Sequence, residues 1–307
     1  MTRISSAMLN ANALQHLQRA QEDMFEAQRQ SATQRKADDV KGYGRETKSL
    51  VTLQRMQARG ESHLQTAQEV NLRLSLQDAQ LGQAANVISD LKEKLTSALA
   101  LNDLSEADSF ISNAFSDLKS AFNATHNGKY MFSGTLTETA PIQAASLSEL
   151  AANPLSDAVI QEGKEVDVRI DDARSVRAAP LAKDAAPEIF SILRDLKIFN
   201  DSADGPFDGN PTDLQESAIK TALADLETAF TNINTVQAQN GQAMNETDSI
   251  IERQQAENDL LENLTADITE VDLAEVAVKL NQAQLQFQAS ASIFNRIQSL
   301  SLVDYLS

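Results

Sequence analysis

The sequence predicts a mainly α-helical protein, built as an elongated antiparallel helical bundle or coiled coil. Apolar residues recur at alternating steps of three and four along most of the chain, which is typical of helices that pack along a narrow seam. The 307 residues are 42% apolar but only 5% aromatic, with 10 glycines and 6 prolines. This composition favours long helices over a thick globular core. The expected layout pairs the N- and C-terminal helices at one pole and places a small β-containing insertion at the other.

The stretch from Ile268 to Leu300 has the clearest pattern. Its heptad seam consists of Leu273, Val276, Leu280, Ala283, Phe287, Ser290, Phe294, Ile297 and Ser301. A second apolar line at Val271, Val278 and Leu285 widens the face beyond what one partner helix would cover. We therefore expect a helix that is covered on more than one side.

The N-terminal stretch from Ile4 to Thr33 has the same period but few large apolar side chains. Such a helix is marginal alone and orders only against a partner. Residues 1–60 contain ten Lys or Arg against six Asp or Glu, whereas 267–307 contain two against five. The opposite charges predict a weak attraction between the two terminal segments, within one molecule or between copies.

Two longer helices are expected in the middle of the chain. No proline interrupts Arg45 to Ala100, and nine of ten seam positions between Ala67 and Ala98 are apolar. A second helix from Thr212 to about Ala266 is its natural antiparallel partner. Between them, Ser105 is the expected N-cap of a shorter helix with an apolar face. That face consists of Ile111, Phe115, Leu118 and Phe122.

Residues 128–182 are expected to form the β-containing insertion. Asn127-Gly128 is typical of a hairpin turn, and a short strand should follow it up to Thr135. Alternating Val166, Val168 and Ile170 predict another strand. Residues 200–212 are rich in Asp, Gly and Pro and are expected to be a solvated turn. The predicted domains are 1–44 with 267–307, 45–127 with 183–266, and 128–182.

No motif for catalysis, a cofactor or a metal is found. Metalloprotease, nucleotide-binding and nucleophile-elbow motifs are absent, and the three histidines lie far apart without ligand spacing. The acidic loop at 200–212 lacks the order of a calcium loop. We therefore expect neither an enzyme nor a metal or cofactor site.

The overall charge and hydropathy restrict the partners. A net charge of −18 argues against nucleic acid as a partner. No apolar run reaches the length of a membrane span, and no cleavable secretory signal is visible at the N-terminus. We expect no membrane insertion, and either a soluble protein or export without removal of a leader.

Four segments near the C-terminus are informative: Asp272–Glu275, Leu280–Gln284, Gln288–Ser290 and Ser301–Leu306. They resemble the flagellin superfamily, and most closely its hook–filament junction members. Gly128–Thr135 is similar to the junction members' entry into the tip, and Met1–Leu17 with Asp38-Asp39 and Gly42 fits the superfamily. The superfamily's Ser-Gly-Lys-Arg turn is replaced here by Thr33-Gln34-Arg35-Lys36.

The resemblance implies a structural subunit of the extracellular bacterial flagellum, exported unfolded through the flagellar type III pathway. Its implied partners are other copies of itself in a ring, the hook-side junction protein, flagellin of the filament and a cytoplasmic export chaperone. A filament flagellin is the alternative, followed by a secreted helical effector or a coiled-coil scaffold.

Terminal helices that are marginal in the monomer would become ordered when buried among neighbouring subunits. The residues expected at that assembly interface are Leu14, Leu17, Leu273, Leu280, Phe287, Phe294, Ile297, Leu302 and Tyr305. The alternative is that these side chains fill an intramolecular bundle.

Overall fold

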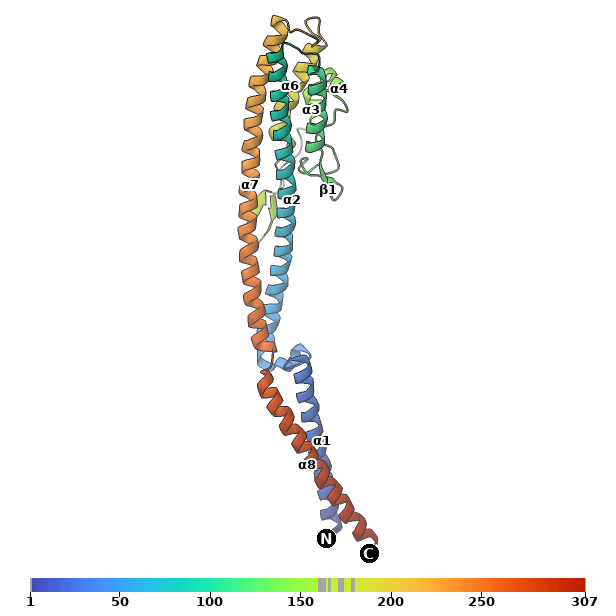
Figure 1. The fold of residues 1–307 in the computed structure, drawn as a ribbon. Coiled ribbons are helices and arrows are strands. Elements are labelled where there is room, and N and C mark those ends of the chain that lie inside the picture. Colours follow the sequence, from blue (N-terminus) through green and yellow to red (C-terminus); the bar gives the residue numbers. More distant parts are fainter. Residues whose placement is uncertain (1, 160–163, 165–166, 171–173, 178–179, 307) are drawn as a thin grey trace. The chain divides into compact units, whose positions relative to one another are not determined.

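A computed structural model describes residues 2–306 except 160–163, 165–166, 171–173 and 178–179 (Figure 1). Near the chain ends, side chains are described for Met8 and from Ala11 to Ile297. The described part is mainly helical, with two small two-stranded antiparallel sheets, which confirms the predicted fold class. The chain forms two compact units, residues 1–60 with 256–307 and residues 61–255.

Two long helices, α2 (Thr47–Leu101) and α7 (Asp213–Thr269), form the frame of the second unit. They run antiparallel, because residues later in α2 contact residues earlier in α7. These contacts join Asn71 to Asp248, Asp78 to Gln237 and Lys92 to Glu227. The heptad seam is buried as expected, from Leu74 to Leu95 on α2 and from Ile219 to Val236 on α7.

Shorter helices pack on this frame and enclose an aromatic cluster. They are α3 (Ala107–Phe122), α4 (Leu147–Ala152), α5 (Leu155–Ala158) and α6 (Ala182–Asn200). The rings of Phe115 and Phe122 meet that of Phe190 edge to face, at centroid distances of 5.8 and 6.2 Å. The predicted apolar face of α3 is therefore confirmed, because all four of its residues are buried.

The expected N-cap of α3 is wrong by one residue. Glu106 holds that position and makes no side-chain cap. The Ser105 hydroxyl instead donates to Asp103 Oδ1 at 2.6 Å and accepts from the amide of Gly209 at 3.2 Å. Ser105 thus fastens the loop before α7 to the loop after α2.

That loop, between α6 and α7, is not simply a solvated turn as expected. Phe207 is buried and its ring stacks on that of Phe199, with 5.6 Å between the ring centroids. The buried Asn200 accepts from the amide of Phe207 at 2.7 Å. At the end of the loop, Thr212 and Gln215 form a reciprocal cap that starts α7.

Two hairpins form the β structure. Strands β1 (Thr125–His126) and β2 (Lys129–Tyr130) are joined by Asn127 and Gly128, both with positive φ, so the turn is confirmed. The strand after the turn ends at Tyr130 and does not reach Thr135. Strands β3 (Asp167–Arg169) and β4 (Ser175–Arg177) confirm the second predicted strand in part, since Val166 lies outside the described residues.

Hairpin β3–β4 packs on the long helices, away from the aromatic cluster. Ile170 and Val176 are buried in a separate apolar cluster with Val70 and Leu74 of α2 and Ile250 of α7. The insertion is therefore not only a tip, because part of it covers the side of the helical frame.

The aromatic cluster should supply a large share of this unit's stability. We expect Phe190→Ala to lower the free energy of unfolding by about 3–5 kcal/mol, because it empties a fully buried ring site. Urea unfolding followed by circular dichroism measures the loss. Leu101→Ala is the control, since Leu101 is exposed and its truncation should change stability by less than about 0.5 kcal/mol. Equal effects of the two substitutions would contradict this account of the core.

Candidate assembly surface

The candidate site is the pair of terminal helices, α1 (Thr2–Thr33) and α8 (Leu273–Leu306), in the first unit. The helices lie side by side and antiparallel (Figure 1). The predicted C-terminal helix begins later than expected, because Ile268 and Thr269 belong to α7. Asp272 starts α8 by accepting from the amides of Ala274 and Glu275 at 2.8 and 3.3 Å.

The seam between α1 and α8 is thin. Its α1 side steps through Ala13, Leu17, Ala20, Met24 and Ala27, and its α8 side runs from Val276 to Ile297. Among the described side chains, the buried ones are Ala13, Ala20, Ala27, Val276 and Ala283. Because four of these five are alanines, the pair removes little apolar area from water. The larger seam residues stay only partly covered.

The structure places the predicted interface residues in three groups. Those that line the seam and are half-buried are Leu17, Leu280, Phe287, Phe294 and Ile297. Leu14 lies outside the seam and is 44% exposed, whereas Leu273 lies at the first position of α8 and is 49% exposed. The side chains of Leu302 and Tyr305 lie outside the described residues, although both positions belong to α8.

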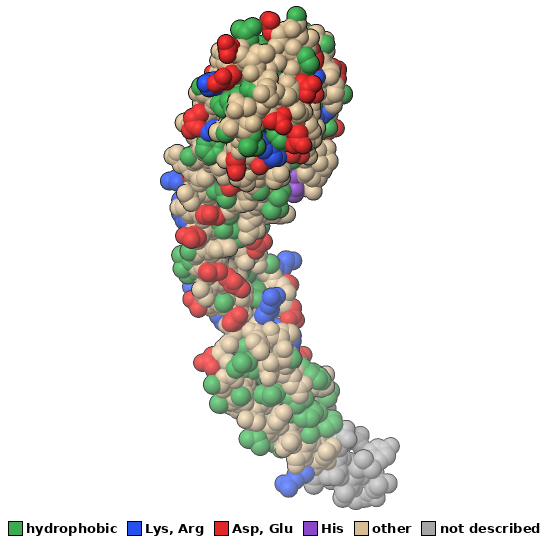
Figure 2. Space-filling view, turned by 45° about the horizontal axis from the view of Figure 1, so that its top comes forward, with side chains coloured by type: hydrophobic (Ala, Val, Ile, Leu, Met, Phe, Trp, Pro, Cys, Tyr) green, Lys and Arg blue, Asp and Glu red, His purple; other side chains and the backbone are tan. Residues whose placement is uncertain are grey.

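A second apolar surface was not among the predicted interface residues. Val278 and Leu285, one heptad apart on the face of α8 opposite the seam, are 65% and 68% exposed. Ile293 on α8 and Phe25 on α1 are also exposed. Hydrophobic side chains are visible over the surface of this unit in the lower part of Figure 2. The sequence indicated this surface by the second apolar line through Val271, Val278 and Leu285. In the structure, Val278 and Leu285 of this line are exposed.

A hollow of about 430 Å³ lies along one side of the pair, where both helices carry small side chains. It is lined by Ala13, His16, Arg19, Ala20, Asp23, Gln286, Ala289, Ser290 and Ile293. Apolar surface and a shallow concavity on one unit are features of protein–protein contact sites.

An elbow joins the terminal helices to the long ones. The segments 34–36 and 269–271 pair as a short antiparallel bridge, with Lys36 N donating to Thr269 O at 2.8 Å and Val271 N to Gln34 O at 3.1 Å. The Lys36 ammonium donates to the carbonyls of Asp267 and Ile268 at 2.8 and 2.9 Å. A cation therefore satisfies the last carbonyls of α7, where the helix dipole is negative.

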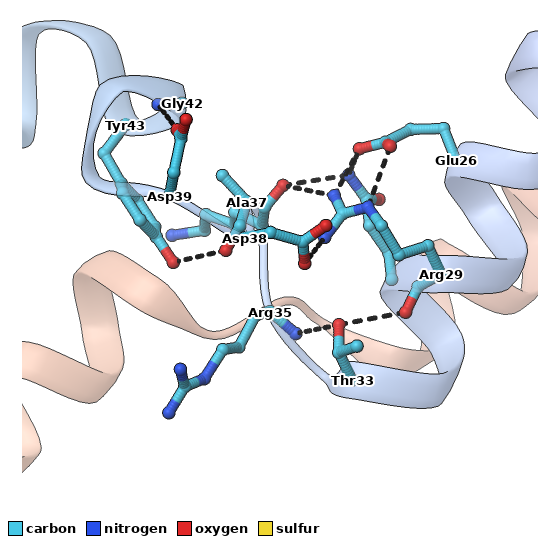
Figure 3. A network of polar contacts seen from close by, with 11 residues as sticks. Glu26, Arg29, Thr33, Arg35, Ala37, Asp38, Asp39, Gly42 and Tyr43 are labelled. Carbon is cyan, nitrogen blue, oxygen red and sulfur yellow. Dashed lines mark hydrogen bonds and ion pairs between the residues drawn. The ribbon is translucent and has the colours of Figure 1, made fainter.

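Arg29 holds the turn that precedes the elbow (Figure 3). Its guanidinium contacts Glu26 and Asp38, both at 2.6 Å, and donates to Lys36 O at 3.0 Å. The hydrogen bond from Arg29 lowers the pKa of Glu26, and the two carboxylates raise the pKa of Arg29. Beyond the turn, Asp39 caps the 3-10 helix η1 (Val40–Glu46) by accepting from Gly42 N at 2.9 Å. The elbow is thus fixed by polar contacts and needs no large apolar core.

Gln34, which stands where the superfamily's turn motif has glycine, has a φ of +57°. That conformation favours glycine, and a side chain there is tolerated at some cost.

In the described ranges, no group of three or more His, Asp or Glu side chains is arranged to hold a metal ion. A membrane span requires a longer uncharged apolar run than any helix has in the part of the chain that the structure describes.

Acid should loosen the elbow. Because Glu26 has a lowered pKa in the fold, its contribution to stability is fully present above its ordinary pKa of 4.5 and is lost as the pH falls through the lowered pKa. The free energies of unfolding of wild type and Glu26→Gln, from thermal unfolding, should differ at pH 7 by no more than about 1 kcal/mol, because the pair is partly exposed. The difference should disappear in a pH titration into acid, and a difference that does not change with pH would exclude the charged pair as its cause.

Comparisons with known proteins agree with this architecture. Residues 223–306 match the family model of the bacterial flagellin C-terminal helical region. The comparison with curated proteins gave no significant match.

Two solved structures have a similar fold. One is a protein from Vibrio parahaemolyticus described as flagellar hook-associated, with a TM-score of 0.56 and 17% identity, covering 75% of this chain and 98% of that one. The other is Bacillus cereus FlgL, with a TM-score of 0.51 and 13% identity, covering 66% and 99%. Residues 223–306 are therefore similar to the C-terminal helical region of flagellins, and the two solved structures share the fold of this chain.

Proposed function

We propose that this protein is a structural subunit of the bacterial flagellum that forms the junction between hook and filament, as hook-associated protein 3 does. The observation that carries the proposal is the thin seam between α1 and α8, of which α8 lies within the region that matches the flagellin C-terminal model. In this proposal, residues 1–44 with 267–307 are the assembly domain, 45–127 with 183–266 the helical bundle, and 128–182 the insertion.

Assembly supplies the cover that the chain itself lacks. The half-buried Phe287 and Phe294 and the exposed Val278 and Leu285 lie on different faces of α8. A single intramolecular partner leaves some of this apolar surface in water, which costs about 25 cal/mol for each Å². Neighbouring copies in a ring would bury it, so that ordering of the terminal helices is coupled to association. The proposal places the nine residues predicted from the sequence at this assembly interface.

The junction is favoured over the filament by two sequence segments. Gly128–Thr135 and the ending Ser301–Leu306 resemble junction proteins more than filament flagellins. The family match at 223–306 fits both, and a filament flagellin is therefore the second candidate. The two candidates predict different consequences when the protein is missing.

The remaining parts of the proposal concern location and partners. The subunit is exported by the flagellar type III route and is bound beforehand by a cytoplasmic chaperone. Outside the cell it contacts the hook-side junction protein on one side and flagellin on the other. It has no catalytic activity and needs no cofactor.

Deletion of the gene tests the junction role. Cells without the protein should release flagellin into the medium and keep hooks without filaments, because the filament has nothing to attach to. Electron microscopy of the cells and immunoblotting of the medium provide the readout. Attached filaments of reduced number or length would instead identify a filament flagellin.

Complementation of the deletion tests the interface. Phe287→Asp with Phe294→Asp should fail to restore filaments, since it puts two carboxylates into the proposed contact, while residues 61–255 stay folded. The matched control, Leu101→Asp with Leu214→Asp, changes two exposed leucines of the other unit and should restore them. Filaments restored by the phenylalanine variant would refute the interface assignment.

A further inference from the structure

The seam between α2 and α7 changes character along its length. From Leu81 to Leu95 it is aliphatic, whereas between 61–77 and 240–255 its buried positions include Gln77, Asn240, Thr247 and Gln254. We call these two facing segments the polar section. Seam positions of this kind contribute less to stability than aliphatic ones.

The polar section carries unsatisfied groups. Asn240 is 2% exposed and donates to Leu74 O at 2.9 Å, and Gln77 is 0% exposed and donates to Met131 O at 2.8 Å. The side-chain carbonyl oxygens of both amides are buried and find no hydrogen-bond donor among the described residues. Each such oxygen costs about 1–3 kcal/mol of stability. The polar section is therefore the weaker part of the helix pair.

Hairpin β3–β4 lies directly on this weak part. Ile170 and Val176, both buried, pack with Val70, Leu74 and Ile250. Among the residues that the structure describes, this cluster is separate from the one formed by α3 and α6 with the aliphatic part of the seam. The hairpin thus supplies the third layer that the polar section would otherwise lack.

The hairpin is itself a marginal element. Each strand has three residues, and an isolated two-stranded hairpin is barely stable in water. Its packing is also incomplete, because a hollow of about 300 Å³ remains between it and the helices. The hollow is lined in part by Leu74, Val176, Val236, Asn240 and Ala243. Hairpin and polar section therefore depend on each other for order.

We propose that hairpin β3–β4 is a strap that keeps the polar section of the α2–α7 pair closed. Release of the strap opens residues 61–77 and 240–255 as one unit, while the aliphatic seam and the aromatic cluster stay folded. Segments that open at a lower free energy than global unfolding are those with few buried apolar contacts. Without the strap, the polar section has few such contacts. The polar section is thereby the part of the α2–α7 pair that deforms most easily, and packing of hairpin β3–β4 sets how easily it deforms.

Amide hydrogen exchange of the full chain tests the strap. In Ile170→Ala with Val176→Ala, amides of 61–77 and 240–255 should exchange at least tenfold faster, and those of 81–95 and 219–236 should be unchanged. Ser175→Ala, an exposed neighbour on the same strand, is the matched control and should have no effect. Ile170→Val is a milder second variant that should show the same regional pattern at smaller size.

A second pair of substitutions tests the cause. Adding Gln77→Leu and Asn240→Leu to the strap variant should restore slow exchange, because leucines remove the unsatisfied oxygens and make the section aliphatic. Unchanged exchange of the polar section in the strap variants, or equal acceleration of the aliphatic seam, would overturn the proposal. So would failure of the leucine pair to slow the exchange.

Discussion

The pairing of α1 with α8 in the first unit depends on a contact made largely by alanines. Ala13, Ala20, Ala27 and Ala283 are buried between α1 and α8, where a self-sufficient helix pair would place leucines. Each alanine removes little apolar area from water, so the seam brings the helices close without making them stable. The polar elbow around Arg29 and Lys36 holds the chain at their base, and it adds order without adding a core. In the proposed function, neighbouring copies supply the stability that this pair lacks.

The second unit, in contrast, has a large apolar core of its own. Its aliphatic seam and the rings of Phe115, Phe122 and Phe190 form one continuous core, closed by α3 and α6. Even there the chain is uneven, because Gln77 and Asn240 interrupt the seam and a small hairpin covers them. Stability thus varies along the same two helices. The side chains at the seam positions set this variation, because most of the stability of helices in proteins comes from packing of the apolar face.

Local patterns predicted local structure well. Heptads located α2, α7 and most of α8, and Asn127-Gly128 located the first hairpin turn. The failures involve contacts that a local pattern does not show. The sequence predicted Ser105 as an N-cap, but its hydroxyl accepts from the amide of Gly209. It predicted residues 200–212 as a solvated turn, but Phe207 in this segment is buried and stacks on Phe199. The alternation through Val168 predicted a strand, but it did not predict that the hairpin packs on α2 and α7.

The same limit applies to the candidate site. The period placed Leu17, Leu280, Phe287, Phe294 and Ile297 on the seam, where the structure has them half-buried. Leu14 follows Ala13 directly, and one residue turns a helix by about 100°, which moves its side chain out of the seam. Leu273 has the right phase but is the first residue of α8, so less of the partner helix covers it. Periodicity identifies a face, whereas the extent of cover depends on where helices begin and what packs beside them.

The central claim is that α1 and α8 are stable only when neighbouring molecules cover them, and limited trypsin digestion of the dilute monomer tests it most directly. Arg19 on α1 and Lys279 on α8 provide cleavage sites in the terminal pair, and Lys92 and Lys94 on α2 provide reference sites in the other unit. The account predicts early cleavage at the terminal sites, loss of both ends, and a resistant body that contains residues 61–255. Terminal sites that resist cleavage as long as Lys92 and Lys94 would show a self-contained helix pair and contradict the account.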